Sequence, residues 1–436
     1  MYNMYDLIEK KKHALPLSKE EIDYIVTNFT NEIIPDYQMS AFLMAAWFNK
    51  LSEDETFYLT QAMKDSGDVM DLSEVEGIIA DKHSTGGVGD KISLILSPIM
   101  ACLGVKIAKM SGKGLGFTGG TIDKLESIPG FSTHLQRDEF IENINSIGMS
   151  ITSQSANLTP ADKKIYALRD VTAIVDDTAL IASSIMSKKL AMGADVIALD
   201  VKCGSGAFMK EYIDAEKLAR QMVAIGKNAG KKISAVITDM NAPLGRCVGN
   251  SIEVTEAVMC LKGQIPDDIK QVTYALGAQI LILSDIASDE AYAYKMMDDA
   301  ISSKKAYNKF IQFITAQGGD AIYIEDTAKL PLSNIIVNVR AETEGYICAI
   351  DCEKVGRAAA EAGAGRKKKD DVIDYGAGIY FNKTYGEHTQ KTGIIAQIYS
   401  SNKEAANTAY EILKDAITIS GSNPPERKLV KGVING

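Results

Sequence analysis

The chain has 436 residues, of which 46% are hydrophobic and 24% are charged, the balance of an ordinary globular protein. This length predicts two or three domains. The formal net charge of −10 argues against broad binding to nucleic acids or anionic membranes, because such binding depends on basic surfaces.

Cysteine usage and the apolar stretches bear on where the protein works. The six cysteines form no C-x-x-C pair and have no histidine partner at zinc spacing, which indicates free thiols in a reducing cytoplasm. Residues 1–12 are polar, so we expect no signal peptide. The longest apolar stretch, 92–108, is broken by proline and glycine and is too short for a membrane span.

Residues 1–66 predict the first part of a small all-helical domain. Ser18 and Ser52 each stand three residues before a glutamate, the spacing of a capping box. Between them, residues 39–48 are densely apolar. This helix is therefore expected to be buried, either against the rest of the chain or in a homodimer interface.

Residues 67–158 predict the first part of an α/β domain that carries two phosphate-binding loops. Strands are expected to end at Ala80 and to span 105–108, with a helix at 91–103 between them. The loops 82–90 and 109–121 both combine glycines with serine and lysine, which suits a phosphate. Loops that leave the carboxyl ends of parallel strands meet at one edge, so both should face one site.

Two better-known phosphate motifs fit poorly. A Walker loop needs Gly-Lys followed by Ser or Thr, but Lys113 is followed by Gly114. Residues 114–119 satisfy G-x-G-x-x-G, yet the acidic candidate about twenty residues on, Asp138, starts a helix at 139–147 and ends no strand.

Residues 159–193 predict the second part of the helical domain. Thr159 is expected to cap a helix that begins at Pro160, and a second helix is expected at 180–192. Ser184 and Lys188 stand at i and i+4 and share a face of that helix. Arg169 either belongs to a site or pairs with its neighbour Asp170 on a solvated surface.

The rest of the chain predicts the remaining α/β part, 194–334, and a C-terminal α+β domain, 335–436. The α/β part carries strands at 195–202 and 233–237 around a helix at 212–230. The C-terminal part carries strands at 335–340, 345–350 and 393–399, a basic turn at 363–371 and a last helix at 401–420. The fold class expected is α/β: a large mixed α/β domain with a small all-helical domain and a C-terminal α+β portion.

Three segments closely resemble the pyrimidine-nucleoside phosphorylases and thymidine phosphorylases. They are KHSTGGVGD at 82–90, SGKGLG with TGGTIDKLE at 111–126, and YALRDVTA at 166–173. The resemblance extends over essentially the full chain. It implies a homodimer, here expected to form through the N-terminal helices, with the active site in a cleft that closes between a helical and a larger α/β lobe.

The resemblance also implies a reaction and a set of site residues. Inorganic phosphate, the co-substrate, attacks C1′ of uridine, thymidine or deoxyuridine and releases the base and a pentose 1-phosphate, with no organic cofactor. The phosphate-binding residues implied are Lys82, Ser84, Ser93, Lys109, Ser111 and Thr121. The residues implied on the base side are Arg169, Ser184, Lys188 and Tyr166. Arg169, Lys188 and His83 are the expected catalytic groups, and His83 is expected to titrate near neutrality and to donate to O2 of the base.

Two positions depart from the family pattern. Phe117 stands where relatives commonly have histidine, which leaves sugar and base selectivity open. Lys91 stands where relatives tend to have an uncharged residue, next to a monovalent-cation (potassium) site. The groups implied for that site are Gly89, Leu244, Cys247 and Glu256. We expect the Lys91 ammonium to replace the ion by pairing with Glu256; the alternative is that Lys91 turns outward and the ion binds.

Three alternative functions remain. One is a thymidine phosphorylase strict for 2′-deoxynucleosides. Another is an enzyme like anthranilate phosphoribosyltransferase, which is similar in architecture but binds pyrophosphate with a metal through acidic motifs that this chain lacks. The third is a nucleoside-binding protein without catalysis.

Overall fold

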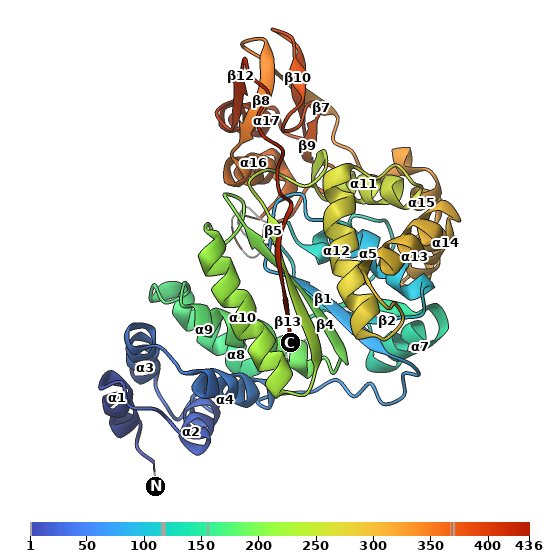
Figure 1. The fold of residues 1–436 in the computed structure, drawn as a ribbon. Coiled ribbons are helices and arrows are strands. Elements are labelled where there is room, and N and C mark those ends of the chain that lie inside the picture. Colours follow the sequence, from blue (N-terminus) through green and yellow to red (C-terminus); the bar gives the residue numbers. More distant parts are fainter. Residues whose placement is uncertain (1, 115–118, 155–156, 367, 369–370) are drawn as a thin grey trace.

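A six-stranded sheet forms the centre of the computed structural model, which describes residues 2–114, 119–154, 157–366, 368 and 371–436 (Figure 1). Its strand order is β13-β5-β4-β1-β2-β3, and all neighbours are parallel except β13, which is antiparallel to β5. The strands are β1 (Ile79–Ser84), β2 (Lys106–Ser111), β3 (Met149–Ser153), β4 (Val196–Cys203), β5 (Lys232–Asp239) and β13 (Val430–Asn435).

Helices cover both faces of this sheet because its strands are apolar on both sides. In β4, Val196 and Ala198 pack into one buried cluster with the helices α5 and α12, whereas Ile197 and Leu199 pack into another with α9 and α10. Successive side chains of a strand point to opposite faces, so a continuous apolar run can serve two layers. The helices named are α5 (Ile92–Cys102), α9 (Thr178–Ala191), α10 (Tyr212–Asn228) and α12 (Asp267–Leu283).

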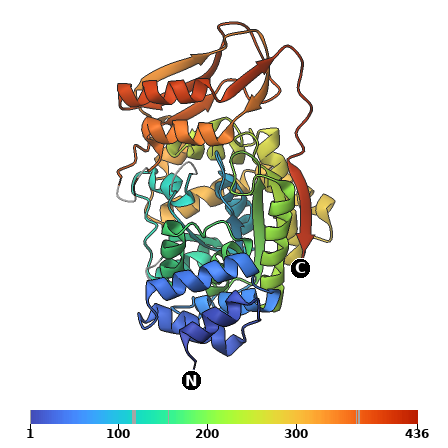
Figure 2. The ribbon, with the colours of Figure 1, turned by 90° about the vertical axis from the view of Figure 1, so that its left-hand side faces the viewer.

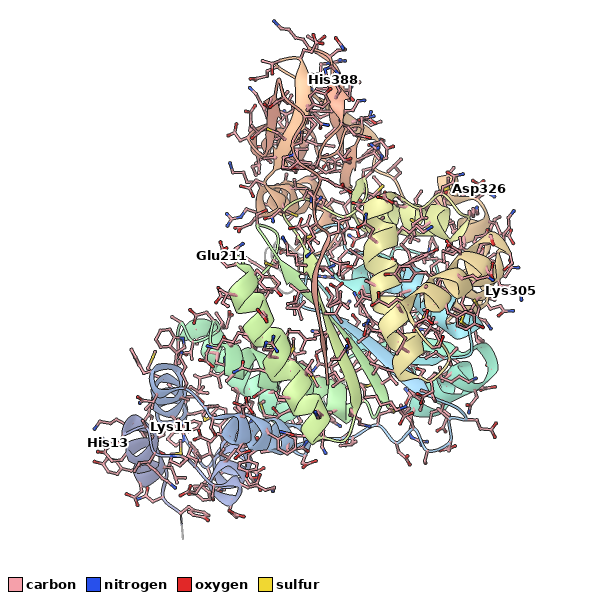
Figure 3. The ribbon with its side chains drawn as sticks, in the orientation of Figure 1. Lys11, His13, Glu211, Lys305, Asp326 and His388 are labelled. Carbon is pink, nitrogen blue, oxygen red and sulfur yellow. The ribbon has the colours of Figure 1, made fainter. Side chains whose placement is uncertain are left out.

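The N-terminal helices form a separate bundle beside the sheet. They are α1 (Met4–Lys12), α2 (Lys19–Thr30), α3 (Asp36–Asn49) and α4 (Glu53–Lys64). Both predicted capping boxes are present, at Ser18 and Ser52. Within the bundle, Lys11 forms a buried ion pair of 2.9 Å with Glu55, whereas His13 is exposed (Figure 3). The helix α8 (Pro160–Val171) and the start of α9 join the same apolar cluster.

Of the remaining helices, α11, α13 and α14 pack on α5 and α12, and the remaining strands form two smaller sheets. The helices are α6 (Thr121–Glu126), α7 (Arg137–Ile147), α11 (Ser251–Leu261), α13 (Glu290–Ser302), α14 (Lys305–Ala316), α15 (Ile322–Glu325), α16 (Cys352–Ala359) and α17 (Lys403–Lys414). The strands are β6 (Cys247–Gly249), β7 (Ile335–Arg340), β8 (Gly345–Ile350), β9 (Gly378–Phe381), β10 (His388–Thr389), β11 (Ile394–Ser400) and β12 (Ile417–Ser420). Figure 2 shows the N-terminal helices and the C-terminal strands at opposite ends of the molecule.

The C-terminal portion and the central sheet exchange strands. One C-terminal sheet has the order β6-β9-β11-β7, and its β6 comes from the α/β part of the chain. Conversely, β13 follows the C-terminal strands in sequence but pairs with β5 of the central sheet. Two sets of backbone hydrogen bonds therefore tie the C-terminal portion to the α/β portion.

Several predicted boundaries are wrong. β1 does not end at Ala80 but continues to Ser84, because Asp81 and Lys82 find buried partners of opposite charge. Thr159 precedes α8 in a left-handed conformation (φ +47°), and its side chain does not cap the helix. The final predicted helix ends at Lys414 and is followed by β12.

The predicted fold class is confirmed: a mixed α/β portion carries an N-terminal helical bundle and a C-terminal portion of strands and helices. None of the helices in the described part of the chain combines the length and the apolar character needed to cross a membrane.

Candidate active site

A cavity of about 470 Å³ opens where the carboxyl ends of β1 and β2 face α8 and α9. It is lined by both glycine loops and by side chains from the two helices. Ten of the predicted site residues line it: His83, Ser84, Ser93, Lys109, Ser111, Thr121, Tyr166, Arg169, Ser184 and Lys188. The two loops thus face one space, as parallel strand order requires.

Lys82 is the predicted phosphate ligand that does not line this cavity. Its buried ammonium lies 3.2 Å from Asp200 and 3.8 Å from Asp90. Two carboxylates therefore hold Lys82 behind the first loop. Its ammonium adds positive charge near the cavity without lining it.

Asp90 organises the first loop. Ser84 donates its hydroxyl to Asp90 at 2.6 Å, and the Ile92 amide at the start of α5 donates to the same carboxylate at 3.2 Å. Burial alone would raise the Asp90 pKa, but Lys202, Lys82 and other ammonium groups around it hold the pKa well below its usual range. Asp90 is therefore a permanent anion that fixes the loop and compensates the lysines.

Lys109 is a buried lysine that changes its protonation state near neutral pH. Its Nζ donates to the carbonyl of Lys82 at 2.5 Å and lies 3.8 Å from Asp81. Burial lowers the Lys109 pKa to about 7, and repulsion from Lys189 and Lys82 adds to this effect, while Asp81 opposes it. An anion that entered the cavity would favour the charged form.

His83 lines the cavity as a neutral imidazole. Burial lowers the His83 pKa well below its ordinary value, and the positive charges of Lys189 and Lys109 lower it further. The expectation that His83 titrates near neutrality is therefore wrong. Its Nε2 is buried and has no hydrogen-bond partner among the described residues, so this atom is available to a ligand.

Arg169 is 2% exposed, so the alternative in which it pairs with Asp170 on a solvated surface is wrong. Its guanidinium donates to the carbonyls of Ile174 (3.1 Å), Leu180 (3.1 Å) and Val175 (2.9 Å). Since arginine carries five N–H donors, two remain for the cavity. Arg169 thereby joins α8 to α9 and also faces the cavity.

Lys188 and Ser184 lie on the same face of α9, as their spacing predicts. The Lys188 ammonium is paired with the buried Asp162 of α8 and also donates to the Ser184 hydroxyl at 3.1 Å. Tyr166 of α8 is partly exposed beside them, with the Arg169 guanidinium 6.0 Å from its ring centre. The base side of the predicted site is therefore assembled from the two helices.

Sequence reasoning missed the buried charges under the loops. Lys189 pairs with Asp81 at 2.8 Å, and Lys202 pairs with Asp200 at 2.8 Å, all four side chains being nearly fully buried. The available signal was the placing of Asp81 directly after the apolar residues 78–80 and of Asp200 within the apolar run of β4, because an ionised group is buried only with a partner.

Three of the groups that the resemblance implies for a monovalent cation contact the ammonium of Lys91 instead. Lys91 is fully buried, and its Nζ donates to the carbonyls of Leu244 (2.9 Å) and Cys247 (2.8 Å) and to Glu256 (2.5 Å). Burial alone would lower the Lys91 pKa, but the carboxylate of Glu256 raises it above its ordinary value. The oxygens that would hold a potassium ion are thus occupied by an ammonium, and Lys91 does not turn outward. No cluster of three or more His, Cys, Asp or Glu side chains suited to a metal occurs among the described residues.

Phe117, the position that leaves selectivity open, lies outside the described residues. Phe208 and Met209 line the cavity, and the Phe208 side chain is largely exposed.

Comparisons with known proteins cover almost the whole chain. Residues 5–67 match the helical bundle domain of a glycosyl transferase family, residues 76–307 match the a/b domain of that family, and residues 346–420 match the pyrimidine nucleoside phosphorylase C-terminal domain. The chain is 49% identical over 416 residues to a pyrimidine-nucleoside phosphorylase of Staphylococcus epidermidis, covering 95% of this chain and 96% of the relative. It is also 49% identical over 419 residues to a pyrimidine-nucleoside phosphorylase of Geobacillus stearothermophilus, covering 96% of each chain.

A more distant structure shares the fold. The crystal structure of anthranilate phosphoribosyltransferase from Thermus thermophilus superposes with a TM-score of 0.58 at 15% identity, covering 72% of this chain and 99% of that one. Such low identity carries information on the fold alone. The near full-length identity and the matched C-terminal domain show that this chain belongs to the pyrimidine-nucleoside phosphorylase family.

Proposed function

We propose that this protein cleaves pyrimidine nucleosides with inorganic phosphate, yielding the free base and ribose or deoxyribose 1-phosphate. The observation that carries the proposal is the single cavity lined by both glycine loops, Lys109, Arg169 and Lys188, in a chain 49% identical to pyrimidine-nucleoside phosphorylases. Uridine, thymidine and deoxyuridine are the proposed substrates. The direct test is release of uracil or thymine when the purified protein is incubated with nucleoside and phosphate.

The proposed chemistry forms one bond and breaks another at the same carbon. A phosphate oxygen bonds to C1′ while the bond from C1′ to the base nitrogen breaks, and the electron pair leaves with the base. Negative charge therefore develops on the pyrimidine oxygens and ring. Donors fixed in place before the reaction stabilise that charge more than they stabilise the neutral nucleoside.

The base side supplies such donors. The Arg169 guanidinium is held rigidly by three backbone carbonyls, so its two remaining N–H groups need no reorganisation when charge develops. Lys188 adds a point charge whose counter-ion, Asp162, is buried behind it. His83 has a lowered pKa and acts as a neutral donor to O2 of the base.

The phosphate side combines hydroxyl groups with Lys109, whose pKa of about 7 lets it gain a proton when an anion binds. Ser84, Ser93, Ser111 and Thr121 present hydroxyls to the cavity, and Lys109 gains its proton as the phosphate dianion enters. Closure of the helical portion onto the sheet brings phosphate and nucleoside together and excludes water. The unpaired state of all six cysteines, each within the described residues, supports the cytoplasm as the place of action.

A homodimer is proposed through the N-terminal helices. On α3, Tyr37, Ala41 and Phe48 are exposed and Met44 is half-buried, and these residues follow each other at i, i+4, i+7 and i+11. This spacing places them in one apolar stripe along the helix, in which Met44 packs partly against the bundle core and the other three side chains are exposed. A second copy of the chain with the same stripe would bury it.

We expect Lys188→Ala to lower kcat/KM for uridine by about 10²–10³-fold, because it removes a donor that acts on the departing base. Arg169→Ala should lower turnover as strongly and should also lower the unfolding temperature, because it breaks the link between α8 and α9. Steady-state kinetics and thermal unfolding measure both effects. Lys164→Ala, on α8 but paired with the exposed Glu32, is the control and should behave like wild type. Near-normal turnover of both test variants would refute the base-site assignment.

Phosphate binding should take up a proton between about pH 8 and 9. Lys109, with a pKa of about 7, is mostly neutral there, and a bound dianion raises the pKa. Affinity for phosphate should therefore fall as the pH rises through this range. Calorimetry in buffers of different ionisation enthalpy counts the protons taken up. Lys109→Arg stays charged throughout and should show almost no uptake; equal uptake by both proteins would contradict the assignment.

Wild-type activity should be the same in potassium chloride and in choline chloride, because Lys91 supplies the internal cation. Lys91→Thr should lose stability, since Glu256 is left buried without its partner, and potassium should restore stability and rate by filling the vacated space. Lys91→Met fills that space with an apolar chain and should not respond to potassium. A steep potassium requirement of the wild type would contradict the prediction.

The double variant Tyr37→Glu with Phe48→Glu should sediment as a monomer where the wild type sediments as a dimer. Two carboxylates placed in the apolar stripe would be buried without partners in the interface. Lys19→Glu, on an exposed face of α2, serves as the control for added negative charge. A dimer that survives the double change would place the interface elsewhere.

A further inference from the structure

A chain of buried polar contacts connects the C-terminal portion to the second glycine loop. Arg366, in the segment that follows α16, donates from Nη1 to Oδ1 of Asp123 at 2.7 Å. Oδ2 of the same carboxylate accepts the backbone N–H of Gly114 at 2.6 Å, and Gly114 lines the cavity. The Arg366 and Asp123 side chains are 10% and 2% exposed, so the pair is shielded from solvent.

The segment that carries Arg366 is anchored at several points. The Asn250 side chain donates to the carbonyl of Ala364 at 2.9 Å, which fixes the backbone just before Arg366. Gly363 ends a short π-helical turn with a φ of +118°, a conformation that requires glycine. After the segment, the Tyr375 hydroxyl donates to Glu126 at 3.4 Å. The described residues on both sides of this segment, Ala364 and Tyr375, are therefore held by the α/β portion.

The short helix α6 links this contact to the first loop as well. Lys124, next to Asp123, donates to the carbonyl of Asp90 at 2.7 Å and pairs with Glu253 of α11 at 2.7 Å. The backbones of the two ends of the second loop approach so closely that a Cβ on Gly120 would lie 2.1 Å from the Gly114 nitrogen. The position of Asp123 therefore fixes Gly114 and, through it, the place where the two described ends of the second loop meet.

We propose that Arg366 is a positioning residue of the phosphate subsite, so that the C-terminal portion sets the affinity for phosphate. This inference rests on the proposed phosphorolysis. Arg366 compensates the charge of Asp123 and aims its second oxygen at the Gly114 amide. Without Arg366, an uncompensated carboxylate would stand directly behind a loop that receives an anion. Repulsion and a misplaced loop would then both weaken phosphate binding.

Loss of Arg366 should leave nucleoside binding unchanged. Arg169, Ser184 and Lys188 come from α8 and α9, and the contacts that fix them involve those two helices and the turn between them. Loss of Arg366 is therefore expected to change the KM for phosphate and not the KM for the nucleoside. A general loss of folding would not separate the two constants in this way.

The test compares Arg366→Ala with wild type, with phosphate and uridine each varied at saturating levels of the other. A charge-assisted hydrogen bond predicts a rise of roughly tenfold or more in the KM for phosphate, with the KM for uridine within about twofold. Arg357→Ala is the matched control, because Arg357 belongs to the same portion but pairs with Glu353 on an exposed surface. Its constants should equal those of wild type.

A second variant separates charge from general disruption. Adding Asp123→Asn to Arg366→Ala removes the uncompensated charge, while the amide oxygen can still accept the Gly114 N–H, so phosphate affinity should partly recover. A KM for phosphate within twofold of wild type in Arg366→Ala, equal rises in both KM values, or no recovery in the double variant would overturn the proposal.

Failure of the proposed function would look different. If the wild type releases no base from any pyrimidine nucleoside, phosphorolysis is refuted. The role of Arg366 is then decided by calorimetric titration of inorganic phosphate into wild type, Arg366→Ala and Arg357→Ala. Weaker binding by Arg366→Ala alone supports that role, and equal binding by all three proteins overturns it.

Discussion

The structure depends on the balance of buried charge beneath the two glycine loops. Asp81 and Asp200 lie inside β1 and β4, Asp90 lies in the first loop, and lysines from β1, β2, β4 and α9 compensate them. An anion site needs positive charge, but an uncompensated cluster of ammonium groups would be too costly to bury. The carboxylates allow the lysines to be concentrated in one place. Burial nevertheless leaves Lys109 only weakly charged, so that a bound anion would favour its charged form.

On the helical side, backbone carbonyls compensate the buried positive charge of Arg169. Three of the five N–H groups of Arg169 donate to carbonyls at the junction of α8 and α9, and Lys188 forms an ion pair with the buried Asp162. The groups that would meet the base are thus fixed before it binds, which is the condition for selective stabilisation of the transition state. At the start of α5, Lys91 serves as an internal cation between two carbonyls and Glu256. Because this ammonium belongs to the chain itself, it holds Leu244, Cys247 and Glu256 together at any salt concentration.

Much of this arrangement could be predicted from the sequence, because local patterns carry it. The alternation of strand and helix predicted the parallel sheet, and the order of its strands predicted that the two glycine loops face one space. The pairing of Lys91 with Glu256 is also confirmed. Long-range partners could not be predicted: Lys82 of β1 pairs with Asp200 of β4, and Lys189 of α9 pairs with Asp81 of β1. Local propensity predicted one helix to Ser420, whereas pairing with β8 makes its last residues a strand. The neutrality of His83 depends on burial and on lysines from other elements.

The antiparallel pairing of β13 with β5 has a consequence for biosynthesis. Ser234 and Ile434, which meet in this pair, are separated by 200 residues. While the chain emerges from the ribosome, β5 therefore remains an open edge through the synthesis of all the intervening helices and C-terminal strands. An unpaired apolar edge can recruit other strands, so slow translation of that interval prolongs the period in which aggregation competes with folding. A chaperone that shields β5 would act in that interval.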